Sequence, residues 1–233
     1  MPHYEYDKDY PFAAFITNLG KYNEGSLVGE WVKFPTTAEE LQKVFERIGI
    51  GSKDDFGQPY EEWFITDYDC PDEVIGKVLG EYESLSELNY LAGQIMELRE
   101  SDDFWQAVLD LGENTGSVQE LINLTENLDC FDYLPGVRND YDLGYYWIEE
   151  SGCYDTSNLG ALANYIDYES FGRDIRYEEG GMFGDNGYVQ SNGGRFVDIY
   201  DGDIENIPEE YQISSPVVME RAAAKKQNER HER

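Results

Sequence analysis

Carboxylates are the side chains that could do chemistry in this chain of 233 residues. The chain carries 49 Asp and Glu against 17 Lys and Arg, which gives a formal net charge of −32 at pH 7. A surface of that charge repels nucleic acids, anionic lipids and acidic substrates, and it attracts proteins with basic grooves. With so many carboxylates, some pair can always be found at the spacing of a glycosidase acid and nucleophile, so their abundance is no evidence of catalysis.

Other catalytic and metal-binding chemistry finds little support in the sequence. The two histidines, His3 and His231, lie near the chain ends, so we predict neither a Ser-His-Asp triad nor a Cys/His metal set. Residues 18–25 lack the Lys-Ser/Thr pair of a phosphate-binding loop, and residues 198–203 do not place oxygens at EF-hand positions. We therefore expect no enzyme, no cofactor and no metal, with an acidic hydrolase or calcium-dependent module as the least favoured alternative.

The cysteines and the hydropathy pattern indicate a cytoplasmic protein. Cys70, Cys130 and Cys153 are odd in number and widely spaced, which favours buried or incidental thiols in a reducing compartment over a disulfide frame. The start of the chain has no basic region followed by an apolar stretch, and no apolar run is long enough to span a bilayer. We expect neither export nor a membrane partner.

The first third of the chain has the pattern of a small α+β unit. Phe12–Asn18 and Leu27–Phe34 are apolar and β-prone and predict the two strands of a hairpin around a turn. A capping box at Thr36–Glu39 precedes apolar residues at helical spacing, which predicts a helix up to Gly49. A third strand is predicted at Trp63–Tyr68.

The middle of the chain is predicted to be helical. A second capping box, Ser84–Glu87, opens an apolar stripe that predicts a helix to about Arg99. Further stripes predict helices over residues 104–111 and 118–124. Since Arg99 is the only basic residue between positions 83 and 129, the solvent faces of these helices should be almost purely acidic.

The last third mixes strand and helix patterns again. Residues 130–134 predict a strand, and apolar positions from Leu143 to Ile148 and from Leu159 to Ile166 predict two helices. Strands are predicted around Val189 and over Phe196–Tyr200.

These elements predict an α+β fold that is elongated and divided into three small domains. The predicted domains are an N-terminal α+β domain at 1–82, a central helical domain at 83–129, a C-terminal α+β domain at 130–204, and a tail without an assigned role at 205–233. The N-terminal domain holds 17 acids and 7 bases, the central domain 11 acids and 1 base, and the C-terminal domain 15 acids and 4 bases. The tail holds 6 acids and 5 bases. The charge is therefore spread along the folded part. It corresponds to roughly 54 Å of duplex DNA, which an elongated shape would present better than a ball.

Several motifs resemble those of ArdA-type antirestriction proteins, a family encoded by plasmids, transposons and phages. The resemblance spans about residues 12 to 201 and rests on residues 15–25 with Leu27, Gly29 and Trp31, and on residues 64–68, 84–89, 146–152, 164–168 and 171–174. It implies an acidic, curved dimer whose carboxylates imitate the phosphates of bent DNA. The implied partners are the specificity and methyltransferase subunits of type I restriction-modification enzymes, whose groove such a protein occupies in competition with DNA.

Two sets of residues are candidates for these contacts. The resemblance places the antirestriction motif and dimer contact around Cys153 to Tyr168, with Leu159, Leu162, Tyr165, Ile166 and Tyr168 as buried or interface positions. The predicted acidic array comprises Glu97, Glu100, Asp102, Asp103, Glu113, Glu120, Glu126, Glu149, Glu150, Asp167 and Glu169. Acids three or four apart on a helix lie about 5–6 Å from each other and can form a ridge of charge. The alternative is a mimic directed at another DNA-binding protein, such as a nucleoid protein or a different defence enzyme.

Overall fold

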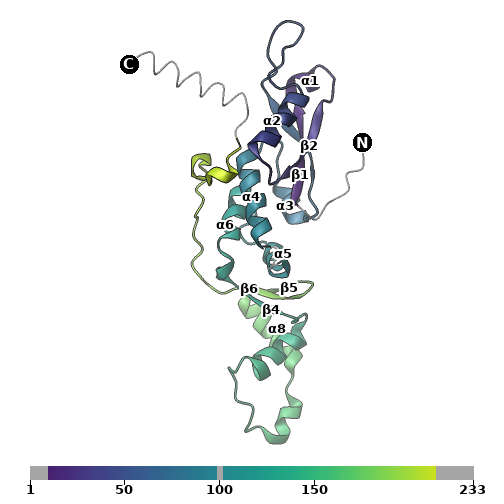
Figure 1. Cartoon of the computed structure of the whole chain (residues 1–233). Helices are drawn as coiled ribbons and strands as arrows, with labels where there is room; N and C mark the ends of the chain where they lie inside the picture. The colour runs from purple at the N-terminus through teal and green to yellow at the C-terminus, as the bar shows by residue number, and fades with distance from the viewer. Residues whose placement is uncertain (1–9, 99–101, 214–233) are drawn as a thin grey trace, which may run out of the picture. The chain divides into compact units, whose positions relative to one another are not determined.

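The computed structural model describes residues 10–98 and 102–213, and it divides the chain into two compact units. The first unit contains residues 10–97, 116–122 and 200–213, and the second contains residue 98 and residues 102–115 and 123–199. Each unit combines helices with one three-stranded antiparallel sheet (Figure 1). The predicted α+β class is confirmed.

The sheet of the first unit has the strand order β2-β1-β3. Strands β1 (Phe12–Asn18), β2 (Gly29–Phe34) and β3 (Trp63–Asp69) lie where the sequence predicted strands, and β1 pairs antiparallel with both neighbours. As the central strand, β1 is buried on both faces, which explains its nearly unbroken apolar sequence. The predicted turn contains one short helix, α1 (Leu19–Asn23), capped by the side chain of Asn18.

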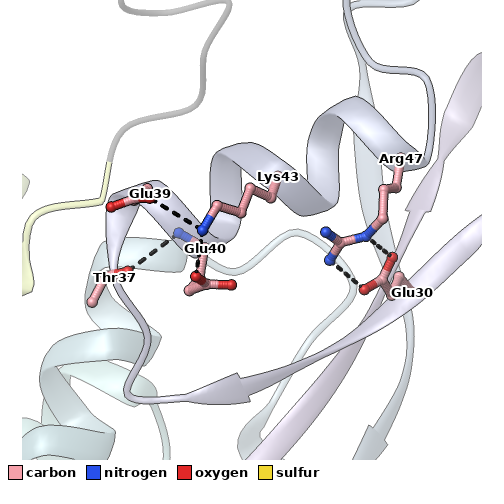
Figure 2. Close-up of polar contacts among 6 residues, drawn as sticks. All are labelled: Glu30, Thr37, Glu39, Glu40, Lys43 and Arg47. Atoms are coloured by element: carbon pink, nitrogen blue, oxygen red, sulfur yellow. Dashed lines mark hydrogen bonds and ion pairs between the residues drawn. The ribbon is translucent and has the colours of Figure 1, made fainter.

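Helix α2 (Ala38–Arg47) covers this sheet and begins one residue later than the predicted capping box. Thr37, rather than Thr36, is the N-cap, and its hydroxyl accepts a hydrogen bond from the Glu40 amide at 3.2 Å (Figure 2). The helix buries Leu41, Val44 and Phe45 at the predicted spacing. A further helix that the sequence analysis missed, α3 (Glu73–Val78), starts at an Asp72 cap.

Helix α4 (Leu85–Glu97) begins as the second capping box predicted, with the Glu87 amide donating to the Ser84 hydroxyl. It ends at Glu97, and Arg99, where the prediction ended, lies outside the described residues. Helices α5 (Asp102–Leu111) and α6 (Val118–Thr125) match the other two predicted helices of the middle segment.

Residues 200–213 form a C-terminal strap that packs on α4 and contains two 3-10 turns, η5 (Ile204–Asn206) and η6 (Glu209–Tyr211). Its side chains Tyr200, Ile207 and Ile213 are almost completely buried. The Ser86 hydroxyl donates to the Ile213 carbonyl at 3.1 Å and accepts from the Ile213 amide at 3.0 Å. A Cβ at Gly93 would overlap the ring of Tyr211, so the strap lies directly against the helix backbone.

The second unit has a sheet of strand order β4-β6-β5, made of β4 (Phe131–Pro135), β5 (Met182–Phe183) and β6 (Gly187–Ser191). A 3-10 turn, η2 (Leu128–Cys130), precedes β4. Helix α7 (Asp140–Tyr145) continues into a π-helical turn, η3 (Tyr146–Glu150), and helix α8 (Tyr168–Glu179) leads into β5. Val137, Leu143 and Tyr188 form a buried cluster of this unit.

Two predictions for the last third of the chain were wrong. Phe196–Tyr200 is not a strand, because the side chain of Asn127 takes the place of a strand partner. Its amide donates to the Val197 carbonyl and its oxygen accepts from the Val197 amide, both at 2.9 Å. The stripe from Leu159 to Ile166 forms a 3-10 helix, η4 (Gly160–Tyr165), with no buried residue.

Helix α8 was not predicted, although its ends carry recognisable signals. Asp167 caps its start by accepting from the Ser170 amide at 3.0 Å, and Gly180 ends it in the left-handed conformation. Of the three cysteines, all free, Cys130 is buried, Cys70 is half-buried and Cys153 is exposed. Among the described residues, no helix is both long and apolar enough to cross a membrane.

We predict that a chain ending at Ile199 is less stable than one ending at Ile213. The shorter chain loses the burial of Tyr200, Ile207 and Ile213, which should lower the free energy of unfolding by about 4 kcal/mol or more. Urea denaturation of the two truncated chains measures the difference, and both lack the same residues after 213. Deleting the strap also removes five acids and no base, and the loss of their repulsion acts against the expected destabilisation. Equal stabilities of the two chains would show that the packing of the strap contributes little.

Candidate functional site

Every member of the predicted acidic array whose side chain is described is exposed to solvent. In the first unit these are Glu97 and Glu120, and in the second unit Asp103, Glu113, Glu126, Glu149, Glu150, Asp167 and Glu169. Glu100 and the side chain of Asp102 lie outside the described residues. These carboxylates are therefore on the surface, where a basic partner could reach them.

The three-residue spacing of Glu97, Glu100 and Asp103 does not make a ridge on one helix. Glu97 is the last residue of α4, and Asp103 is the second residue of α5. Glu113 follows α5 just after Gly112, whose positive φ turns the chain. The array is thus divided among separate helices and turns, and helical periodicity is no guide to its spacing.

Several basic side chains are paired with acids of their own unit. Arg47 on α2 donates to both carboxylate oxygens of Glu30, at 2.8 and 2.6 Å, and Lys43 lies 2.8 Å from Glu40 and 3.1 Å from Glu39 (Figure 2). The hydrogen bond to Glu40 raises the pKa of Lys43, which keeps this ammonium charged. Exposed pairs of this kind add little stability. Their consequence here is electrostatic, because each base cancels an adjacent acid.

Tyrosine hydroxyls hold other acids in place without cancelling their charge. Five tyrosine hydroxyls each donate a hydrogen bond to a glutamate carboxylate at 2.6 to 3.4 Å. The pairs are Tyr60 to Glu24, Tyr168 to Glu149, Tyr188 to Glu179, Tyr200 to Glu87 and Tyr211 to Glu97. The hydrogen bond to its glutamate raises the pKa of Tyr60 and that of Tyr168 to about 12, so both phenols stay protonated donors at neutral pH. A neutral donor fixes the rotamer of a carboxylate and leaves its full charge available.

Helices α7 and α8 of the second unit cross with their backbones in contact, and two glycines make this possible. A Cβ at Gly144 would overlap the Tyr168 carbonyl oxygen, and one at Gly172 would overlap the carbonyl oxygen of Asp140. Next to the crossing, the Arg176 guanidinium donates to both carboxylate oxygens of Asp140, at 2.8 and 3.3 Å. The crossing positions α7, η3 and α8, which we call the helical platform. Glu149 and Glu150 lie on η3, and Glu169 lies on α8.

An exposed aromatic surface lies on the same platform. Tyr141 and Tyr145 of α7 are stacked with ring centroids 6.5 Å apart, and the ring of Tyr168 lies 5.5 Å from each. Tyr141 and Tyr145 were not among the site residues predicted from the sequence, although their spacing of four residues on a short helix was a signal that they share a face.

A shallow surface groove of about 360 Å³ adjoins these rings. We call it the tyrosine groove; it is lined by Tyr141, Tyr145, Tyr146, Asp142 and Glu150 and by the turn at residues 135–137. Asp142 is held in place, because its carboxylate accepts from the Arg138 amide at 3.2 Å and from the Asn139 side chain at 2.8 Å. In the part of the chain that the structure describes, no group of three or more His, Cys, Asp or Glu side chains is arranged to hold a metal ion.

The predicted motif residues around η4 lie at the surface of the second unit. Leu162 is 67% exposed and Tyr165 is 84% exposed, and Leu159 is also exposed, whereas Ile166 and Tyr168 are half-buried. Their exposure excludes a role as core residues for Leu162 and Tyr165. The dimer contact stays a prediction for these positions.

A family model described as "Antirestriction protein (ArdA)" matches residues 14–190, well over half of the chain. The matched region contains the acidic array, the motif residues and the tyrosine groove, and the C-terminal strap lies beyond it. A search of curated protein sequences gives no match.

We predict that Gly144→Ala and Gly172→Ala each destabilise the α7–α8 crossing. A methyl group at either position meets backbone atoms that cannot turn aside, so the loss should be about 2 kcal/mol or more. Chemical denaturation should show it as an earlier transition. Gly76→Ala in α3 is the matched control, because its Cβ would meet only the Cys70 Cβ at 3.8 Å. If the variants at 144 and 172 were as stable as this control, the helices would not be in backbone contact.

Proposed function

This chain belongs to the ArdA antirestriction family, and we propose that it inhibits type I restriction-modification enzymes by occupying their DNA-binding groove in place of DNA. Antirestriction activity and an interaction with restriction-modification enzymes follow from family membership. The mimicry of DNA, and the groove formed by specificity and methyltransferase subunits as its target, are the further steps of the proposal. The beneficiary would be an incoming mobile element or phage.

The observation that carries the proposal is the combination of net charge and placement. The chain has 32 more acids than bases, and the array carboxylates that the structure describes are exposed in both units. A DNA-binding groove is lined by Lys and Arg that gain affinity by neutralising phosphates and releasing counterions. Fixed carboxylates on a folded surface can compete for those same contacts, and they need no base-edge pattern because phosphate contacts carry none.

The local structure supports this mechanism because uncharged donors hold several carboxylates of the array in place. Glu149 is oriented by the Tyr168 hydroxyl at 2.6 Å, and Asp103 accepts from the Asn186 side chain at 2.7 Å. Asp167 is oriented by capping α8. Ordered charges lose less conformational entropy on binding than free ones, which favours affinity. The proposed mechanism includes no bond-making or bond-breaking step.

We further propose that the chain acts as a homodimer that associates through the segment around η4. Leu162 and Tyr165 support this placement, since large side chains at that exposure are natural contacts for a second copy. A dimer would double the length of charge that one inhibitor presents to the enzyme.

Purified protein should displace a labelled duplex from a type I methyltransferase core at near-stoichiometric amounts. The dissociation constant of its direct complex with the core should rise at least about tenfold between roughly 0.05 and 0.3 M salt, because contacts between exposed charges are screened. A fluorescence competition titration measures displacement, and calorimetry without DNA at several salt concentrations measures direct binding. Direct binding that does not respond to salt would contradict the electrostatic mechanism, and no displacement by folded protein would direct the search to another DNA-binding target.

Leu162→Glu and Tyr165→Glu should weaken self-association without unfolding the monomer. Both side chains are mostly exposed in the monomer, so little packing is lost, whereas a charge at a contact between two copies is repelled and desolvated. Sedimentation velocity gives the association state, and circular dichroism confirms the fold. Ile199→Glu, at an exposed position of the same unit, adds the same charge as a control. A dimer that all three variants leave intact would place the interface elsewhere.

A further inference from the structure

The tyrosine groove of the second unit combines exposed aromatic rings with carboxylates. Tyr141 is 51% exposed and Tyr145 is 41% exposed, and their rings are inclined by only 16° to each other. Large aromatic rings in water are costly unless a partner covers them. The groove therefore offers aromatic area that a partner could cover.

The rings are held in position before any partner arrives. Tyr141 and Tyr145 stand one turn apart on α7, and Tyr168 packs against both at 5.5 Å. The hydroxyl of Tyr168 is fixed in turn by Glu149 at 2.6 Å. A preformed aromatic surface avoids the entropic cost of ordering side chains on binding.

The electrostatics of the groove select a cation. The face of an aromatic ring carries negative potential and attracts a cation within about 6 Å of its centroid. Glu150 lines the groove, its side chain is exposed, and among the described residues its carboxylate takes part in no hydrogen bond or ion pair. Asp142 adds a second negative charge that its neutral backbone and amide donors leave uncancelled.

We propose that the tyrosine groove binds the guanidinium group of an arginine side chain on the target protein. The planar guanidinium stacks on an aromatic face while its N–H groups donate to a carboxylate, and a lysine ammonium cannot do both in the same way. The proposal rests on the proposed function, which supplies a target lined with basic residues. It adds a short-range contact that selects arginine to an array whose attraction is otherwise long-range and unselective.

Other occupants fit the groove less well. A nucleic acid base could stack on the rings, but its phosphates would be brought against Asp142 and Glu150. A second copy of this chain carries 32 more acids than bases, so its surface is repelled by a groove lined with carboxylates. Charge complementarity therefore favours a basic partner over both.

The test compares two double variants that differ only in the aromatic face. Tyr141→Leu with Tyr145→Leu keeps apolar bulk and removes the rings, whereas Tyr141→Phe with Tyr145→Phe keeps the rings. In the duplex-displacement assay with a type I methyltransferase core, the leucine variant should bind about tenfold more weakly than the wild type, and the phenylalanine variant should match it. Tyr82→Leu, at an exposed tyrosine of the first unit, controls for loss of an aromatic ring in general.

The salt dependence of binding distinguishes the contribution of the groove from that of the acidic array. The loss in the leucine variant should persist at every salt concentration, because stacking acts at short range, whereas Glu150→Gln should also reduce the salt dependence of direct binding to the methyltransferase core. A leucine variant that displaces DNA as well as the wild type would overturn the arginine groove and leave the proposed function intact. So would a leucine variant whose only defect is lost self-association in sedimentation, since the groove would then bind a second copy.

A direct probe tests the groove even if the wild type fails to displace DNA, the outcome that would refute the proposed function itself. Calorimetric titration with a hexa-arginine peptide at about 0.15 M salt should show weaker binding to the leucine variant, and a hexa-lysine peptide should discriminate less between the two proteins. Equal hexa-arginine affinity for the wild type and the leucine variant would overturn the proposal.

Discussion

Repulsion between like charges is the constraint on which the rest of this structure depends. A chain with 49 acids and 17 bases must bury enough apolar surface to offset the repulsion of its own surface. The first unit does so with a central strand buried on both faces and with a C-terminal strap that closes over α4. The second does so with the buried cluster of Val137, Leu143 and Tyr188, and its helices α7 and α8 come to backbone contact at Gly144 and Gly172. In each case tight apolar packing makes a strongly charged exterior compatible with folding.

The way in which acids are held follows from the same constraint. A protein that only needed stability could pair its carboxylates with lysine and arginine, as α2 does with Lys43 and Arg47. Five glutamates are instead held by tyrosine hydroxyls, which orient a carboxylate and do not cancel its charge. Burial raises the pKa of Glu87, and the hydrogen bond from Tyr200 opposes that shift, which favours the charged form. These five tyrosines thus orient charge as well as pack.

Local signals in the sequence predicted most elements, and non-local contacts explain the rest. Strands β1 to β3 and helices α4 to α6 follow from apolar period and capping residues. The strand expected at Phe196–Tyr200 failed because its partner is the side chain of Asn127, about seventy residues away in sequence. The exposure of the array could be predicted from charge alone. The tyrosine groove could not, because Tyr168 and the turn at 135–137 come to α7 only through the tertiary fold.

Charge and geometry contribute differently to recognition in such an inhibitor. A diffuse negative surface accelerates encounter with any basic protein, but it discriminates poorly, since all basic grooves attract it. Discrimination requires contacts that act only when the two surfaces fit, and aromatic faces held by a fixed crossing meet that requirement. The close backbone contact of α7 and α8 then has a functional consequence. If the platform were mobile, the rings would still be attracted to cations, but the orientation that distinguishes one arginine from the many lysines and arginines of a DNA-binding groove would be lost.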